Sequence, residues 1–290
     1  MANTIALAKN YISILDEVYR TASVTADLTS DNSMVRAGAN ANEIIYPQIS
    51  ITGLGDYSRN SGYTEGSVNL EWKTAKFNYD RGTKISVDVM DNEESRNLAF
   101  TMAGATLMRD KVAPEADAFT FAALAGIEGI STATPATYAD AAEFLTALLD
   151  AKNTMDEDEV PEEGRILYAT PTLLNGVMAL DTTKSREILS AFAIKKKVPQ
   201  ARFYTTIDLL DGRTEGEELG HYKKAPTGKD INFMIVHKPA VIKFDKHTAS
   251  DIIPASLNAK ADADISKYRK YGIVDVYKNK VAGIYLSHKE

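Results

Sequence analysis

The longest regular pattern in the chain is a stripe of apolar residues between Asp91 and Ala125. Apolar side chains recur there every three or four positions, which places them on one face of an α-helix. Asp91 suits the N-cap position with Glu94 three residues later, and Gly126 suits the position after the last turn. We therefore predict a helix of about 35 residues, roughly 50 Å long. The stripe consists of Leu98, Met102, Ala105, Val112, Ala116, Phe119 and Ala123.

Pro114 interrupts this pattern, because proline lacks an amide proton and its ring crowds the carbonyl group of Asp110. One interpretation is a pair of medium helices, Asp91–Val112 and Pro114–Ala125. The other is one long bent helix that joins two parts of the molecule. We favour the long bent helix because of the segments that surround it.

Alternating apolar and polar positions before this helix predict strands. Glu43–Ile51 alternates in this way, and Pro47 indicates that the strand lies at the edge of a sheet. A polar run, Thr52–Gly66, separates it from a second alternating segment, Val68–Trp72. The two strands and the polar tip predict a long hairpin.

The apolar positions then change parity in the segment Phe77–Tyr79. Because a shift of one residue moves every side chain to the other face of a sheet, we predict a bulge or bend near Lys73–Thr74. The run Asp80–Gly82 predicts a turn. The strand-like segment Ile85–Val89 then leads directly into the long helix.

The first 42 residues resemble an arm. Ala6–Thr21 has one apolar helical face, and Thr21–Asn42 is a polar run with few large apolar groups. The apolar face needs a cover, which either the chain's own domain or a neighbouring subunit supplies. The sequence leaves both possibilities open.

The middle of the chain alternates helices with strands, which predicts an α+β architecture. The stretch Ile252–Leu286 is mostly strand-like, and a late strand of this kind can return to pair with the first third of the chain. In the middle we expect helices at Thr137–Met155 and Pro171–Leu180, and strands at Arg165–Ala169, Phe203–Leu210, Asn232–Val236 and Ala240–Phe244.

Charge and cysteine content narrow the class of protein. The net charge of -7 argues against a dedicated nucleic-acid binder, which carries a basic excess. The one tight basic run, Lys195–Lys197, is interpreted as a solvated loop, with a contact to nucleic acid or to an acidic neighbour as the alternative. The absence of cysteine excludes disulfides and thiolate chemistry. Because neither a signal pattern nor a bilayer-spanning apolar run occurs, we expect a soluble protein without a membrane partner.

Motifs of catalysis or cofactor binding are scarce. Gly53–Gly55 lacks the third glycine of a dinucleotide-binding loop, and Gly228–Lys229 is followed by Asp230 where a phosphate-binding loop needs Ser or Thr. The histidines lack the spacing of a zinc-binding helix. We therefore predict no cofactor and no metal. A site of paired carboxylates stays open at this point, although nothing in the pattern points to one. The histidines are His221, His237, His247 and His288.

Three stretches of the sequence resemble one family, the major capsid proteins of tailed bacteriophages with the Hong Kong 97 type fold, which encapsulins share. The first is Asp80–Asp88, leading into Asp91–Glu94. The second is Ala113–Ala118 inside the long helix. The third is the ending, Tyr268–Gly272 with Ala282–Tyr285. Each motif is degenerate, and their order and spacing carry the resemblance over nearly the whole chain.

The resemblance implies an α+β capsid fold whose parts have names. These are an N-terminal arm (residues 1–42), the first part of a peripheral domain (43–131) with an extended loop (49–76) and a spine helix (91–125), an axial domain (132–250), and a return to the peripheral sheet (251–290).

The resemblance also implies a function. Such a major capsid protein self-assembles into hexamers and pentamers of an icosahedral shell around double-stranded DNA, and it is not an enzyme. Its partners would be other copies of itself, portal and scaffolding proteins and, by proximity, the packaged DNA. It would be located in the virion capsid after assembly in the host cytoplasm. The alternatives are the shell protein of an encapsulin-type nanocompartment and an α+β enzyme whose active site the motifs do not reveal.

Two departures from the family pattern qualify this expectation. The arm begins almost at Met1, so we expect scaffolding to be a separate protein or a removed propeptide. Some members crosslink covalently through a lysine of the extended loop, whereas the tip Gly53–Gly66 has Arg59 and no lysine. We therefore expect non-covalent contacts between subunits.

An extended hairpin and an arm gain little by folding on their own surface, so burial on neighbours must offset their ordering entropy. We expect apolar anchors at this interface, together with cations of the hairpin that pair with acidic residues of an adjacent subunit's long helix. The anchors are Tyr57, Tyr63, Leu70 and Trp72. The charged residues are Arg59 and Lys73 with Glu93 and Glu94.

Overall fold

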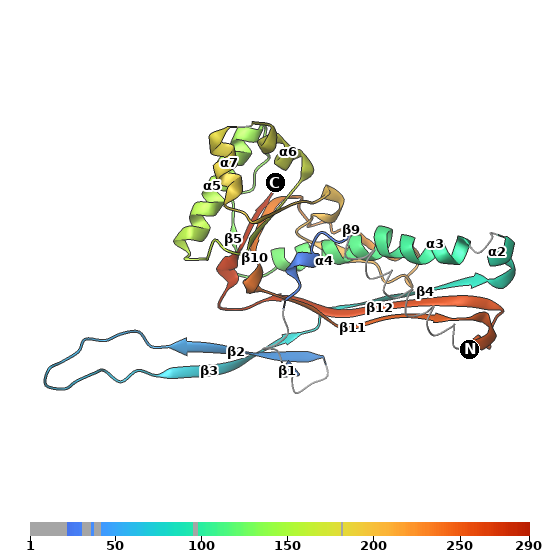
Figure 1. Cartoon of the computed structure of the whole chain (residues 1–290), viewed down its shortest axis with the longest axis horizontal. Helices are drawn as coiled ribbons and strands as arrows, with labels where there is room; N and C mark the ends of the chain where they lie inside the picture. The colour runs from blue at the N-terminus through green and yellow to red at the C-terminus, as the bar shows by residue number, and fades with distance from the viewer. Residues whose placement is uncertain (1–21, 31–35, 38–41, 95–97, 181) are drawn as a thin grey trace.

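The structure of the chain, a computed structural model, describes residues 22–30, 36–37, 42–94, 98–180 and 182–290. In Figure 1, a compact part that carries helices α5 to α7 stands above an elongated layer, in which a long helix runs along a three-stranded sheet. A two-stranded hairpin projects beyond the end of this layer that lies opposite helix α2 (Val89–Glu94) (Figure 1). The predicted helix Ala6–Thr21 lies outside the described residues, as does part of the polar run after it.

The long helix consists of α3 (Leu98–Leu107), a π-helical turn (Met108–Val112) and α4 (Ala113–Ala125), which follow one another in line (Figure 1). Helix α2 precedes it, and residues 95–97 between α2 and α3 lie outside the described residues. The wide π turn ends just before Ala113 and Pro114, where a wider turn accommodates the proline ring and the missing hydrogen bond. The helix therefore continues through Pro114 instead of dividing there.

Helix α2 begins at Val89 and contains Asp91 in its first turn, so Asp91 is not an N-cap as predicted. Asp88 fills that role, because its Oδ1 accepts a hydrogen bond from the amide of Met90 at 2.9 Å. The predicted end at Ala125 is confirmed.

The sheet beside the long helix has the strand order β11-β12-β4, and all its pairings are antiparallel. Its strands are β4 (Tyr79–Asp88), β11 (Val241–Ile253) and β12 (Ala263–Val276). The prediction that a late strand returns to the first third of the chain is confirmed, because β12 pairs with β4 along its length.

The predicted turn at Asp80–Gly82 is wrong, because these residues lie inside the continuous strand β4. Gly82 pairs with Arg269, and a Cβ atom added at Gly82 would lie 2.8 Å from the carbonyl oxygen of Tyr268. The glycine therefore permits a close approach of two strands instead of forming a turn.

The compact part is built on a five-stranded sheet of order β5-β13-β10-β6-β7. Its strands are β5 (Ser131–Thr132), β6 (Arg165–Ala169), β7 (Ile194–Lys197), β10 (Ile231–His237) and β13 (Ile284–His288). Helices α5 (Ala141–Glu157), α6 (Pro171–Leu180) and α7 (Thr183–Ser190) pack against it. A small hairpin joins β8 (Ile207–Leu209) to β9 (Tyr222–Lys224), so the predicted strand Phe203–Leu210 is shorter than expected.

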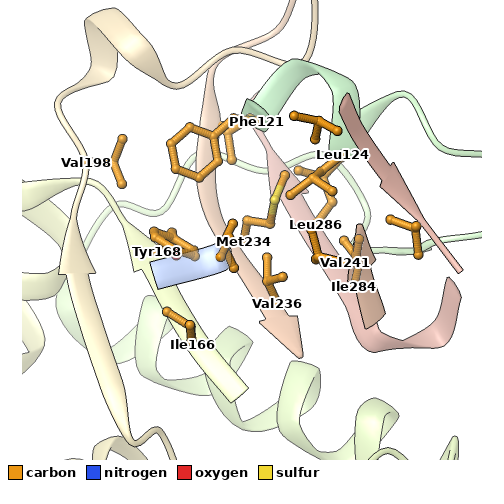
Figure 2. Packing of buried hydrophobic residues seen from close by; sticks show 14 of the residues in the cluster. Phe121, Leu124, Ile166, Tyr168, Val198, Met234, Val236, Val241, Ile284 and Leu286 are labelled. Carbon is orange, nitrogen blue, oxygen red and sulfur yellow. The ribbon is translucent and has the colours of Figure 1, made fainter. Parts of the chain in front are cut away.

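Buried apolar clusters lie on both faces of this sheet. In β6, Ile166 and Tyr168 belong to the cluster that contains Phe121 of α4, and Figure 2 shows this packing. The alternate residues Leu167 and Ala169 belong to the cluster formed with α5, α6 and α7. This alternation fixes the end of the long helix on one face and three helices on the other.

The strand pairings differ from the predicted segment boundaries at two places. Strand β11 begins within 132–250 but belongs to the sheet beside the long helix. Strand β13 falls within 251–290 but joins the five-stranded sheet, next to β10. The return expected of the last segment therefore applies to β12 alone. Short 3-10 helices span Ala26–Leu28, Gln200–Arg202, Lys238–Ala240, Ala255–Leu257 and Val281–Gly283.

Candidate subunit interface

The predicted hairpin is confirmed as strands β2 (Glu43–Ile51) and β3 (Val68–Lys76). Its pairing register is unbroken along the whole length, so the predicted bulge near Lys73–Thr74 is wrong. The short strand β1 (Arg36–Ala37) pairs with Ile45 and Ile44 of β2. In the described residues no strand pairs with Pro47 on that side, and its edge position stays a prediction.

One face of the hairpin packs against the chain's own body at the base. Residues that pair directly across two antiparallel strands share a face, and Ile44 therefore shares a face with Ala75. Both are buried together with Tyr46, whose ring lies 5.0 Å from that of Tyr277. The cluster is completed by Ile242, Phe244 and Ile273 from the long sheet.

Towards the tip the apolar residues occupy the opposite face of the hairpin. Pro47 pairs with Trp72, and the next pairs on this face join isoleucines of β2 to residues of β3. The exposed fractions of the five residues below range from 44% to 70%. The other face carries Gln48, Ser50, Asn69, Glu71 and Lys73. The exposed apolar residues are Ile49, Ile51, Val68, Leu70 and Trp72.

The tip of the hairpin has a local structure of its own. The rings of Tyr57 and Tyr63 lie edge to face with their centroids 4.9 Å apart. Ser58 and Gly62 form a bridge between them, with Gly62 in the left-handed region at a φ of 78°. Both tyrosines are largely exposed, and Arg59 stands in the exposed turn between them. The tip therefore presents two aromatic rings and a cation to solvent.

The charged residues predicted to pair between subunits lie far apart within one subunit. Glu93 and Glu94 are exposed in α2, at the end of the elongated layer opposite the hairpin (Figure 1). Lys73 forms an ion pair with Glu71 of its own strand, at 2.6 Å. The pairing across subunits stays a prediction.

A buried carboxylate fastens part of the arm to the long helix, a feature that the sequence did not predict. Asp117 has no exposed surface and accepts hydrogen bonds from a run of three arm residues and from Arg202. We call these hydrogen bonds to Asp117 the arm clasp. More than ninety residues separate Asp117 from the arm donors, so no local pattern in the sequence predicts the arm clasp. The arm donors are Ser23 Oγ at 2.7 Å, Val24 N at 2.9 Å, and Thr25 N at 3.1 Å and Oγ1 at 2.7 Å.

The same arm segment is held from a second side. The buried amine of Lys243 in β11 donates to the carbonyl oxygen and the hydroxyl of Thr25, at 2.8 and 2.6 Å. Leu28 is fully buried in the core. Burial lowers the pKa of Lys243 to about 8, although nearby carboxylates such as Asp117 oppose this shift.

The basic run Lys195–Lys197 lies in the edge strand β7 and not in a loop, although Lys195 and Lys197 are exposed to solvent as predicted. Lys195 donates to the carbonyl oxygen of Phe192 at 2.8 Å. Lys196 pairs with Asp27 of the arm at 2.7 Å. Two of the three lysines therefore serve contacts within the chain.

In the described part of the chain, no group of His, Asp or Glu side chains is arranged to hold a metal ion. None of the helices in the same residues is long and apolar enough to cross a membrane.

Comparison with known proteins decides the fold. No protein-family model matches the chain, and neither does the sequence of any curated protein. A structure from Mycobacterium phage Che8 matches with a TM-score of 0.59 at 14% identity, covering 91% of this chain and 90% of that one. The capsid of Cyanophage P-SCSP1u matches with a TM-score of 0.62 at 13% identity, covering 93% and 88%. The chain has the Hong Kong 97 type capsid fold.

A third structure with this capsid fold comes from another source. A virus-like particle from Pyrococcus furiosus matches with a TM-score of 0.59 at 10% identity, covering 97% of this chain and 99% of that one. The likeness therefore extends over the whole fold and not over one shared element.

The Hong Kong 97 type fold brings the three stretches behind the sequence resemblance into contact. Arg81 of the first stretch donates from Nε to Glu115 of the second at 2.6 Å. Asp80 accepts two hydrogen bonds from Arg269 of the third, at 2.9 and 2.7 Å. Burial opposes ionisation of Glu115, but His221 and Arg81 beside it hold its pKa below the usual value. These contacts join β4, the long helix and β12.

Proposed function

We propose that this chain is a shell subunit, the major capsid protein of a tailed bacteriophage, which assembles into hexamers and pentamers of an icosahedral shell around double-stranded DNA. The observation that carries the proposal is the projecting hairpin. Its distal apolar side chains are exposed, on a fold that is similar to those of phage capsid structures.

The physical reason lies in the stability of such a hairpin. A two-stranded ribbon is marginally stable by itself in water. From Ile49 to Trp72 nearly every residue of this one is exposed, so the body of the same chain contributes little to its folding. Neighbouring subunits of a shell supply the missing burial.

The parts of the fold take the roles that the resemblance implies. Residues 1–42 form the arm, the long helix and the sheet β11-β12-β4 form the peripheral domain, and the five-stranded sheet with its helices forms the axial domain at the centre of each capsomer. The subunit acts mechanically and is not an enzyme. Its location is the virion capsid, after assembly in the host cytoplasm.

The partners follow from the same role. Copies of the chain contact one another, and portal and scaffolding proteins complete assembly. The net charge of -7 supports a contact with packaged DNA by proximity only, because a dedicated binder would carry a basic excess.

A second candidate is the shell protein of an encapsulin-type compartment. The match to a virus-like particle from Pyrococcus furiosus supports this candidate, because that particle comes from a cellular organism and not from a phage. The two functions differ in what the shell encloses, which is a genome in one case and cargo protein in the other.

Negative-stain microscopy of the expressed chain tests the proposal. We expect closed shells or capsomer rings, alone or after co-expression with a scaffolding protein. Double-stranded DNA in shells from infected cells supports the phage function, whereas cargo protein without a genome supports the compartment. The shells should dissociate to single chains on a denaturing gel, because the hairpin tip has no lysine. Covalently linked subunits would overturn that expectation.

A further inference from the structure

The apolar residues of the hairpin lie mainly on one face at its base and on the opposite face towards its tip. At the base, Ile44, Tyr46 and Ala75 point to the face that packs on the chain's own sheet. Ile45 already lies on the other face at the base, where it is half-buried, and from the pair Pro47 and Trp72 onwards the large apolar residues lie on that other face alone. Since the register is unbroken, this change lies in the sequence and not in a bulge.

Because of this arrangement, the body of the chain that covers the base of the hairpin cannot also cover its distal apolar face. If the apolar residues stayed on one face, the ribbon could lie along the body that already covers its base. Here the face continuous with the buried base carries Gln48, Ser50, Asn69 and Glu71 towards the tip. Within this polar face, Asn69 and Lys73 donate hydrogen bonds to Glu71, at 3.0 and 2.6 Å.

The exposed apolar face is large enough to be an interface. At the exposed fractions given above, its five large side chains present on the order of 500 Å² of surface, against about 800 Å² for one side of a standard protein interface. The face is apolar throughout its length. Its partner is therefore an apolar surface and not an ionic one.

We propose that each hairpin is sided: its base binds its own subunit through one face, and its distal half binds a second copy of this chain through the opposite face, while the polar distal face stays in water. This inference rests on the proposed function, which supplies the second copy. It adds which side chains are buried on assembly and which are not.

The absence of cysteine from the sequence permits a direct test. Leu70→Cys and Asn69→Cys place single thiols on consecutive residues of β3 that point to opposite faces. Both positions are exposed in the free subunit, so a maleimide reagent should label both variants before assembly. In assembled shells, Leu70→Cys should lose labelling and Asn69→Cys should keep it.

A pair of lysine substitutions gives a second readout. Leu70→Lys places a charge on the apolar face, so shells should fail to form, whereas the matched control Asn69→Lys should assemble as the unaltered chain does. Equal labelling of the two thiols in assembled shells, or normal shells from Leu70→Lys, would overturn the sidedness and leave the proposed function intact. An unaltered chain that never assembles would overturn the proposed function, and the sidedness with it.

Discussion

Asp117 of the long helix accepts hydrogen bonds from both the amide and the hydroxyl of Thr25, at 3.1 and 2.7 Å, although 92 residues separate the two in the sequence. The contact ties Thr25, in the middle of the arm, to the helix along which the rest of the subunit is arranged. It therefore fixes this part of the arm on the body.

Removal of this carboxylate should release the arm. Asp117→Ala leaves the buried donors of Ser23 and Thr25 without an acceptor, which should cost about 3 kcal/mol in the free energy of unfolding. Denaturant titration measures this loss, and limited proteolysis should show new cleavage near residue 25. Asp110→Ala is the control, because this exposed residue of the same helix pairs only with Arg109 beside it. Equal losses of unfolding free energy in Asp117→Ala and Asp110→Ala would show that the hydrogen bonds of the arm clasp do not hold the arm.

The buried Lys243 should make stability depend on pH above neutrality. Its pKa is lowered from 10.5 to about 8, so between these values the unfolded chain binds more protons than the folded one. Stability from this residue therefore rises with pH in that window, by up to about 1.4 kcal/mol per pH unit. The free energy of unfolding should rise more steeply in the unaltered chain than in Lys243→Met. Parallel profiles would contradict the prediction.

The stability that Glu115 contributes through its ion pair with Arg81 should depend on pH in the acid range instead. Its pKa lies below the usual 4.5, so its contribution is fully present above that value and is lost as the pH falls through the lowered pKa. Glu115→Gln should cost about 1–3 kcal/mol at pH 7, and the difference from the unaltered chain should shrink under acid conditions. Urea titrations at a series of pH values measure it. A difference that is constant with pH would exclude the ion pair with Arg81 as its source.

The cation at the hairpin tip gives a prediction about assembly. If Arg59 pairs with Glu93 or Glu94 of an adjacent subunit, Arg59→Glu should reduce shell yield, because like charges would then meet. Glu93→Arg and Glu94→Arg together should restore the yield in the charge-reversed background. The effect should weaken with added salt. Normal shells from Arg59→Glu would refute the pairing, and microscopy with particle counting provides the measurement.

The sequence predicted the elements that depend on local patterns. The strand Glu43–Ile51, the helix Pro171–Leu180 and the end of the long helix at Ala125 were predicted correctly, because periodicity over adjacent residues determines them. The apolar positions do change parity after Trp72, but the change does not reflect the predicted bulge. A bulge and a change of apolar face produce the same pattern in one sequence, and only the pairing register separates them.

The contacts that hold the elements together could not be predicted in this way. Gly82 looked like a turn residue, yet it permits the close approach of a strand that lies far along the chain. The partners of Asp117 and of Lys243 are equally remote in sequence. The sequence placed Asp117 within a motif without a stated role, and its function as the arm's acceptor follows only from the fold.

Sedimentation velocity of the purified chain tests the central claim of self-assembly most directly. A subunit of 31.7 kDa that forms capsomers and shells should sediment as rings or closed particles many times that mass, in a proportion that rises with concentration. A single species of 31.7 kDa at every concentration, also after co-expression with scaffolding protein, would contradict the account.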